Sequence, residues 1–171
     1  MPCLKKIELK GFKTFGKPTS ILLEKGFTAI TGPNGSGKTN VMDAVLFGLG
    51  ELSARRLRAE NFAKLIFHGS PEASVEKAKA AKVIMQFDNS DGRIPVDTGT
   101  VTISREVYRN GQSVYRMNGR RMSRANIVDT LALAGISASG HNFVLQGTIT
   151  RMDEFAAFKR SNLSHASNRA L

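Results

Sequence analysis

Alternating apolar and polar positions, and short apolar runs bounded by turn residues, predict several strands in this chain. They are expected at 3–9, 19–23, 27–30, 82–88, 100–108, 113–117 and 142–149. The run at 100–108 alternates through Val101, Ile103, Arg105 and Val107. Asn-Gly pairs follow this run and the next one, and such pairs are typical of tight turns. The strands between 82 and 117 should therefore form an antiparallel sheet, beside the layer that contains the run at 27–30.

Helical spacing of apolar residues predicts a helix at 41–47, which a Gly-Leu-Gly break ends. A second helix is expected after Ser123, a residue type that caps helix N-termini, and should end near Gly135. The stretch 61–67 is expected to be a short helix. The stretch 72–82, rich in Ala, Lys and Glu, is expected to be a surface loop.

The segment between the run at 27–30 and the first helix reads G-P-N-G-S-G-K-T-N and fits the pattern G-x-x-x-x-G-K-[ST]. Its glycines let backbone N–H groups converge on phosphate oxygens, and the helix N-terminus faces the same anion. In this pattern Lys38 reaches the β- and γ-phosphates and the Thr39 hydroxyl coordinates Mg²⁺. A chance match is the alternative, and the flanking strand and helix argue against it. The predicted phosphate-binding loop comprises Gly32, Pro33, Asn34, Gly35, Ser36, Gly37, Lys38, Thr39 and Asn40.

The balance of charge adds an expectation about partners. The 171 residues include 25 Lys and Arg against 14 Asp and Glu, for a formal net charge of +11. This surplus favours a polyanionic partner, nucleic acid before membrane, because no basic amphipathic helix stands out. A solvated basic surface is the alternative, and charge alone does not separate the two.

Cysteine usage and hydropathy favour an intracellular protein. Cys3 is the single cysteine, which excludes an internal disulfide and suits a reducing cytosol. The sequence shows no signal peptide and no apolar run of the roughly 20 residues that a bilayer requires.

The carboxylates of a complete nucleoside triphosphatase are harder to find. Such an enzyme needs an acidic residue at the end of an apolar strand to hold Mg²⁺, and usually a glutamate that positions water. Asp88 ends the nearest such strand, but Gln86 interrupts its apolar run and Asn89 follows where the glutamate is wanted. The histidines are too scattered for a metal site or a triad. The sequence therefore predicts a nucleotide site that has the phosphate-binding loop but lacks the carboxylates for Mg²⁺ and the attacking water.

Several segments together resemble the amino-terminal half of the ATPase head of SMC (structural maintenance of chromosomes) proteins, a branch of the ABC ATPases. The opening L-K-K-I-E-L-K-G-F-K-T-F is similar to the family's first strand and turn, and G-P-N-G-S-G-K-T-N to its phosphate loop. The likeness continues through F-G-L-G-E-L-S-A-R, I-F-H-G-S, the hairpin V-Y-R and Y-R-M-N-G, and V-L-Q-G. It spans roughly residues 2 to 150, and no single motif carries it.

This resemblance implies an α/β fold of the P-loop NTPase class, an ABC-type head lobe with a mixed sheet and an antiparallel β-subdomain. Residues 1–150 would form the lobe. Residues 151–171 would be a divergent or truncated tail, in which the family's coiled-coil heptads do not begin.

For the nucleotide, the resemblance implies ATP and Mg²⁺ bound by residues 32–40, with Lys38 acting on the phosphates. Thr39 would coordinate Mg²⁺. Gln146, in the segment that resembles the family's Q-loop, would bind Mg²⁺ or its water and take part in catalysis.

Basic residues outside the loop also match family positions. Arg58 resembles the arginine of the R-loop, which approaches the nucleotide and links DNA to hydrolysis, and Lys13 to Phe15 would lie near the ribose or base. Arg120, Arg121 and Arg124 would face DNA, and an exposed, screened cluster is the alternative for these three.

The family's acidic strand, catalytic glutamate and signature motif lie in a carboxy-terminal half, and two heads enclose ATP between them. The resemblance therefore implies ATP-gated engagement of heads that organise DNA. This chain would bind ATP but hydrolyse it poorly or not at all when alone. The implied partners are the carboxy-terminal half of the head, a second SMC head, DNA and kleisin-type accessory subunits, in the cytoplasm at the nucleoid and without a membrane.

Other interpretations stay open. Repair ATPases of the RecF and RecN kind share this lobe, although F-G-L-G-E and V-L-Q-G favour SMC. A stand-alone phosphotransferase would need a lid and a complete metal site, and neither is visible in the sequence. A DNA-binding module with a vestigial loop agrees poorly with the intact Lys38 and Thr39.

Overall fold

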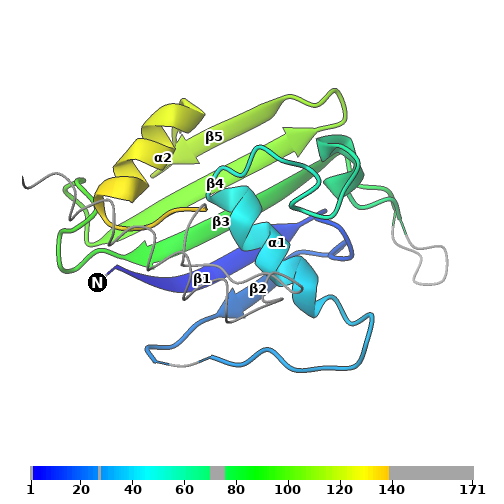
Figure 1. Ribbon diagram of the computed structural model, residues 1–171, viewed down its shortest axis with the longest axis horizontal. Coiled ribbons are helices and arrows are strands. Elements are labelled where there is room, and N and C mark those ends of the chain that lie inside the picture. Colours follow the sequence, from blue (N-terminus) through cyan, green and yellow to red (C-terminus); the bar gives the residue numbers. More distant parts are fainter. Residues whose placement is uncertain (1, 27, 70–75, 139–171) are drawn as a thin grey trace, which may run out of the picture. The chain divides into compact units, whose positions relative to one another are not determined.

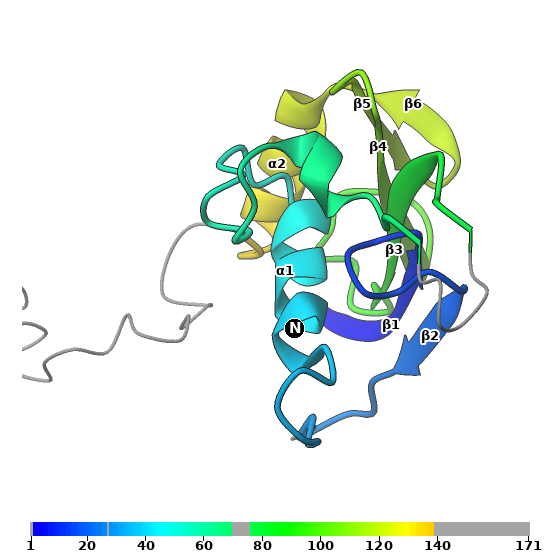
Figure 2. The ribbon, with the colours of Figure 1, turned by 90° about the vertical axis from the view of Figure 1, so that its right-hand side faces the viewer.

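A six-stranded sheet carries helices on one of its faces in the computed structural model (Figure 1). The structure describes residues 2–26, 28–69 and 76–138. The strands are β1 Cys3–Lys10, β2 Thr19–Leu22, β3 Ala80–Asp88, β4 Thr100–Tyr108, β5 Ser113–Met117 and β6 Arg120–Met122, in the spatial order β2-β1-β3-β4-β5-β6. The helices are α1 Lys38–Gly48 and α2 Arg124–Leu133, and η1 Phe62–Leu65 is a short 3-10 helix. Figure 2 shows α1 and α2 on the same side of the sheet.

Most sequence predictions in this region are confirmed. The runs predicted at 3–9, 19–23, 82–88, 100–108 and 113–117 are β1, β2, β3, β4 and β5, with ends shifted by two residues at most. The Ser123 hydroxyl accepts a hydrogen bond from the Asn126 amide and caps α2, as expected. The strand predicted at 142–149 and the domain boundary at 150 lie outside the described residues.

The strand predicted at 27–30 is wrong for the part that the structure describes. Residues 28–33 form no strand and are exposed, and the Ile30 side chain is 46% exposed. Every pairing in the described sheet is antiparallel, and none of its strands pairs with this segment. The apolar composition was suitable, but a strand also needs a neighbour to bond, and the described residues supply none. The resemblance also implies a mixed sheet, but the described residues contain no parallel pair of strands.

Alternating side chains of the sheet make the core. The inward residues of neighbouring strands lie in register, in one row of Leu9, Val83, Arg105 and Tyr115 and a second of Ile7, Met85, Ile103 and Met117. Helix α1 packs on these rows very closely at Gly48, where an added Cβ would lie 2.7 Å from the Met85 methyl carbon. No helix in the described part of the chain is both long and apolar enough to cross a membrane.

The most unusual core residue is Arg105, which occupies an inward position of β4 and is buried. Its guanidinium lies over the rings of Phe47, Phe62 and Tyr115, with centroid distances of 4.1, 4.8 and 4.9 Å. Its Nη1 donates to the carbonyls of Phe47, at 3.0 Å, and Glu51, at 2.7 Å. These carbonyls lie at the C-terminal end of α1, where a cation complements the helix dipole. Burial lowers the pKa of Arg105 to about 10, so it stays charged at neutral pH.

We predict that Arg105→Lys destabilises the fold by about 2–4 kcal/mol. A lysine ammonium is a compact point charge without the planar guanidinium, so it loses the stacking on the three rings even where it can bond a carbonyl. The free energy of unfolding in urea measures the effect. The matched control is Arg116→Lys in β5, whose guanidinium is half-exposed and lies 3.6 Å from Glu106; it should change stability by less than about 0.5 kcal/mol. Equal losses in the two variants would contradict the role given to Arg105.

Candidate phosphate-binding site

The glycine-rich loop leads directly into the N-terminus of α1. Gly37 is the N-cap residue, with φ 89°, in the left-handed region that favours glycine. It has no side chain to bond the first-turn N–H groups, and the first turn contains no acidic residue. The positive end of the helix dipole is therefore left open to an anion from outside the helix.

Lys38, the first residue of α1, folds back over this loop. Its ammonium donates to the carbonyls of Gly32 and Pro33, both at 2.7 Å. An ammonium has three donors, so one remains that the described residues do not use. Thr39, the predicted Mg²⁺ ligand, is exposed beside it. The predicted roles of both residues fit the geometry of the loop and stay predictions.

A turn from the start of the chain packs against the loop. The backbone N–H of Lys13 donates to the carbonyl of Leu65 at 2.7 Å, which fixes the turn 12–15 to the end of η1. The turn brings the Thr14 hydroxyl so close that a Cβ added to Gly37 would lie 3.0 Å from it. The last glycine of the loop thus combines a left-handed backbone with a tight contact.

One turn along α1, the buried carboxylate of Asp43 binds two cations through a single oxygen, Oδ2. Arg58 donates to this oxygen from Nη2 at 2.6 Å and from Nε at 3.2 Å. Lys13 donates to the same oxygen from Nζ, and also to the carbonyl of Leu57. The Asp43 side chain is 3% exposed, so the paired cations replace the water that a carboxylate would otherwise bind.

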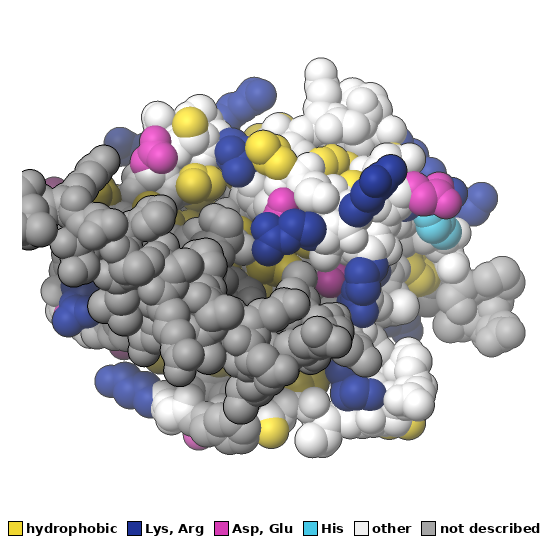
Figure 3. All heavy atoms as spheres, in the orientation of Figure 1, with side chains coloured by type: hydrophobic (Ala, Val, Ile, Leu, Met, Phe, Trp, Pro, Cys, Tyr) yellow, Lys and Arg dark blue, Asp and Glu magenta, His cyan; other side chains and the backbone are white. Residues whose placement is uncertain are grey.

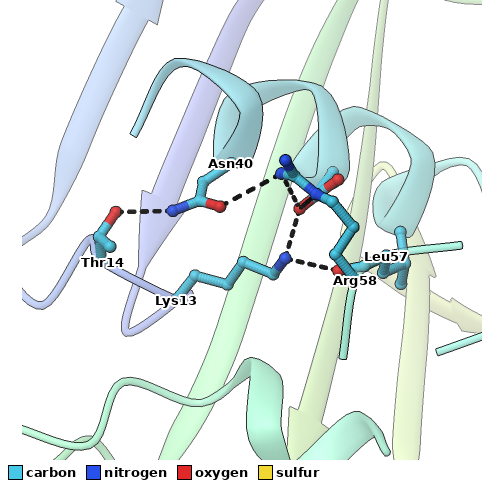
Figure 4. Close-up of polar contacts among 6 residues, drawn as sticks. Lys13, Thr14, Asn40, Leu57 and Arg58 are labelled. Atoms are coloured by element: carbon cyan, nitrogen blue, oxygen red, sulfur yellow. Dashed lines mark hydrogen bonds and ion pairs between the residues drawn. The ribbon is translucent and has the colours of Figure 1, made fainter. Parts of the chain in front are cut away.

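Asn40 connects this carboxylate cluster to the turn beside the loop. Its amide nitrogen donates to the Thr14 hydroxyl at 3.0 Å, and its carbonyl oxygen accepts from Arg58 Nη2 at 3.4 Å. Figure 4 shows these contacts as one connected network of polar contacts, which runs from Thr14 through Asn40 to Arg58, Lys13 and Leu57. Segments far apart in sequence therefore meet within one turn of the phosphate loop.

The two residues that bind Asp43, Lys13 and Arg58, both have a strained, left-handed backbone. Lys13 has φ 49° and Arg58 has φ 52°, and Asn118 is the other described residue besides glycine with a positive φ. A left-handed conformation costs such residues about 1 kcal/mol or more. The shared bonds to Asp43 offset this cost and fix where the two side chains lie.

The other two arginines of the segment 54–58, Arg55 and Arg56, do not lie beside Arg58. Arg56 Nη1 lies 2.5 Å from the buried carboxylate of Glu51, near the C-terminal end of α1, and Arg55 is exposed. Figure 3 shows Lys and Arg side chains spread over the described face rather than gathered in one patch. Of this segment, the contacts bring Arg58 alone to the loop end of the helix.

The three arginines predicted to face DNA do not form one exposed cluster. Arg120 and Arg121 are exposed on β6. Arg124 is half-buried, and its Nε donates to the carbonyl of Gly50 at 2.7 Å, just beyond the end of α1. Arg124 therefore has a structural role as the hydrogen-bond donor to the carbonyl that follows α1.

Other candidates for metal chemistry do not join the site. Asp88 lies 2.9 Å from the Lys5 ammonium and accepts from the Ser90 amide, and these bonds hold the pKa of its carboxyl well below the usual range. It stabilises the turn after β3. The described residues contain no group of three or more His, Cys, Asp or Glu that could hold a metal ion. Gln146 lies outside the described residues.

Asp43 is the site residue that the sequence analysis missed. Asp43 stands four residues after Thr39, inside the apolar run of a buried helix, and such an acid needs a partner. That isolated charge was the available signal, although the pattern did not identify Lys13 and Arg58 as the partners. Thr14 belongs to the range Lys13 to Phe15 that the resemblance implies near the ribose or base, but its contact with Gly37 depends on tertiary packing.

The chain matches the model of the family described as the RecF/RecN/SMC N terminal domain over residues 3–164. It is 48% identical over 161 residues to the chromosome partition protein Smc of Pyrococcus furiosus, and 44% identical over 146 residues to that of Halothermothrix orenii. These matches cover 94% and 85% of this chain but 14% and 12% of the relatives. The chain thus spans about a seventh of the length of the curated relatives that it matches.

Solved structures give the same likeness. The chain is 47% identical, with a TM-score of 0.86, to a protein from a study of ATP-driven dimerization and DNA-stimulated activation of SMC ATPases; the match covers 95% of this chain and 97% of that one. It is 43% identical, with a TM-score of 0.85, to an Smc head from P. furiosus with an extended coiled coil, bound to the C-terminal domain of ScpA; here 98% of this chain matches 46% of that one. RecF in its ATP-bound form is 20% identical, with a TM-score of 0.57 over 74% of this chain and 29% of that one, which shows the fold alone.

The packing at the loop generates a prediction. Gly35 and Gly37 both have left-handed backbones, with φ 82° and 89°, but a Cβ at Gly35 would meet open space. Gly35→Ala should therefore cost about 1 kcal/mol of backbone strain, and Gly37→Ala about 2 kcal/mol, because it also displaces Thr14. Urea unfolding measures both. In Thr14→Gly the extra cost of Gly37→Ala should disappear; a difference that survives there would contradict the contact.

Proposed function

The chain belongs to the RecF/RecN/SMC amino-terminal domain family, and from this membership we propose that it is the ATP-binding half of an SMC-type head. In this proposal residues 32–40 hold the phosphates of ATP, and Thr39 coordinates the accompanying Mg²⁺. ATP then gates the engagement of two heads that act on DNA. Gln146 would complete the metal site.

The observation that carries the proposal is the geometry at the start of α1. The helix presents an uncapped N-terminus without a first-turn acid, and the Lys38 ammonium lies over the loop carbonyls. Backbone N–H groups, helix dipole and ammonium thus act on the same place, which suits a polyphosphate. The described residues supply no carboxylate cluster for Mg²⁺, so hydrolysis requires groups from elsewhere.

We infer the partners on the same basis. They are a carboxy-terminal head half, a second SMC head and a kleisin-type subunit, since a related Smc head was solved with the C-terminal domain of ScpA. A role in chromosome partition places the protein at the nucleoid, in the cytoplasm. The segment at 28–33, which has no strand partner among the described residues, is where the other half of the head would add strands.

Complementation tests this function. We expect the chain to bind MgATP without turnover, and to hydrolyse it when mixed with a carboxy-terminal head fragment of an Smc relative. Lys38→Ala should abolish both binding and the restored turnover, because it removes the charge that faces the phosphates. The control Lys64→Ala changes an exposed lysine of η1 and should retain both. Hydrolysis by the isolated chain, or by the Lys38→Ala mixture, would contradict the half-head.

We propose that Arg120 and Arg121 contact DNA phosphates. Both are exposed on an edge strand, and the chain carries a net charge of +11. Exposed guanidinium groups bind phosphates without regard to sequence. Arg124 stays a predicted DNA contact, because its Nε donates to the carbonyl of Gly50 while the guanidinium has further N–H donors.

The salt dependence of DNA binding tests this surface. Changing Arg120 and Arg121 together to Gln should lower the slope of log K against log [salt] by about 2, because each phosphate contact contributes about 0.9. The control changes Lys17 and Lys25 together to Gln; these exposed lysines flank β2, at the opposite edge of the sheet. It removes the same charge and should leave the slope within about 0.5 of its original value. Equal slopes in the two variants would contradict a localised interface.

A further inference from the structure

The outer face of the sheet, opposite to α1 and α2, has a cavity of about 620 Å³. Figure 2 shows both helices on the other side, and no helix of the described part of the chain covers this face. The cavity is lined by residues of β1 to β4, of the turn before β2 and of the segment before β3. Its volume lies in the range of about 300–1,000 Å³ that is typical of ligand-binding cavities.

Two lysines lie side by side in this outer-face cavity. Arg105 points toward α1, so the next residue, Glu106, points to the outer face, and its cross-strand partner Lys82 does the same. Lys10 on β1 is in turn the cross-strand partner of Lys82. Like charges directly opposite each other destabilise a sheet. Stability therefore does not explain why these two lysines are paired.

The acids around the outer-face cavity are largely neutralised by other cations. Glu8 lies 2.6 Å from Lys6, and Glu106 lies 3.6 Å from Arg116, and neither of these cations lines the cavity. The third acid of the lining is Glu76. Three lining lysines form no ion pair or hydrogen bond with another described residue, namely Lys10, Lys79 and Lys82. The cavity thus has a surplus of unpaired positive charge.

The rest of the lining restricts the class of ligand. Ile84, Ala80 and Pro18 give the cavity an apolar part, which an apolar side chain would cover. A nucleic acid backbone would bring many phosphates close to the carboxylates of Glu8 and Glu76, which would repel them. A peptide can instead place a single carboxylate at the lysines and an apolar side chain beside it.

We propose that the outer-face cavity docks a short segment of a partner protein in which an acidic residue adjoins an apolar one. The carboxylate binds between Lys10 and Lys82, and the apolar side chain packs on Ile84. The bound carboxylate relieves the repulsion between the two lysines. The inference goes beyond the proposed function, because no part of it requires a nucleotide or DNA.

Synthetic peptides test the docking site by NMR on the full 171-residue chain. The peptide Ac-Gly-Glu-Leu-Glu-Gly-amide should shift the backbone amide signals of Lys82 and Ile84, with a dissociation constant of about 1 mM or less. Replacing both Glu of the peptide by Gln, or its Leu by Gly, should weaken binding about fivefold, because each change removes one of the two contacts. Shifts confined to other surfaces, or no shifts at all, would overturn the inference.

Substitutions in the chain locate the carboxylate. Changing Lys10 and Lys82 together to Gln should weaken binding of the Glu-Leu-Glu peptide about fivefold. The control changes Arg55 and Lys64 together to Gln; it removes the same charge from exposed positions beside α1 and in η1, and should leave the affinity unchanged. Equal weakening in the two double variants would contradict a localised contact.

Charge reversal separates recognition from a loss of folding. Changing Lys10 and Lys82 together to Glu should abolish binding of the Glu-Leu-Glu peptide and create binding of Ac-Gly-Lys-Leu-Lys-Gly-amide, which a misfolded chain would not show. A reversed variant that binds neither peptide would overturn the inference. A short DNA duplex that displaces the peptide from Lys82 and Ile84 would assign the cavity to nucleic acid and overturn it as well. Binding of MgATP is measured separately, so failure here leaves the proposed function standing.

Discussion

The buried guanidinium of Arg105 fixes the end of α1 that is farther from the phosphate loop. It bonds two carbonyls at or just beyond that end and stacks on three rings, while Arg124 bonds the carbonyl of Gly50. Cations therefore complement the negative end of the dipole. The positive end carries neither a side-chain cap nor an acid. Because of this asymmetry, helix α1 is held in the core at its C-terminal end and can bind an anion at its N-terminus.

The charges around α1 obey a second constraint, which is that a buried carboxylate must be paired. Glu51 and Asp43 are both buried, and each binds an arginine from the segment 54–58. The segment is thus tied to the helix at two points and its backbone is forced into the left-handed region at Arg58. Asp43 differs from Glu51 because a second cation, Lys13, serves it as well. Only at Asp43 does the arginine become dispensable for charge balance.

The sequence predicted what depends on local pattern. Strand alternation and the Ser123 cap are properties of neighbouring residues, and these predictions are confirmed as elements of the structure. The run at 27–30 failed because a strand depends on its neighbours in space. The alternation at 100–108 placed Arg105 on the same face as its apolar neighbours. The neighbouring sequence does not show that rings and carbonyls from α1 and η1 surround its guanidinium. The Asp43 cluster was hidden for the same reason, because its partners come from two distant turns.

The exposed apolar residues near the loop extend this argument to what the site still requires. Ile30, just before the loop, and Met42, in the second turn of α1, are exposed, and the backbone at 28–33 has no described strand beside it. A loop that is fixed only on its helix side can rearrange on the other. Strands added beside 28–33 would cover the apolar side chains, pair the backbone and bring a strand-end carboxylate toward Thr39, all in one step. In the proposed half-head, one added neighbour would thus supply the strand partner, the apolar cover and the carboxylate together.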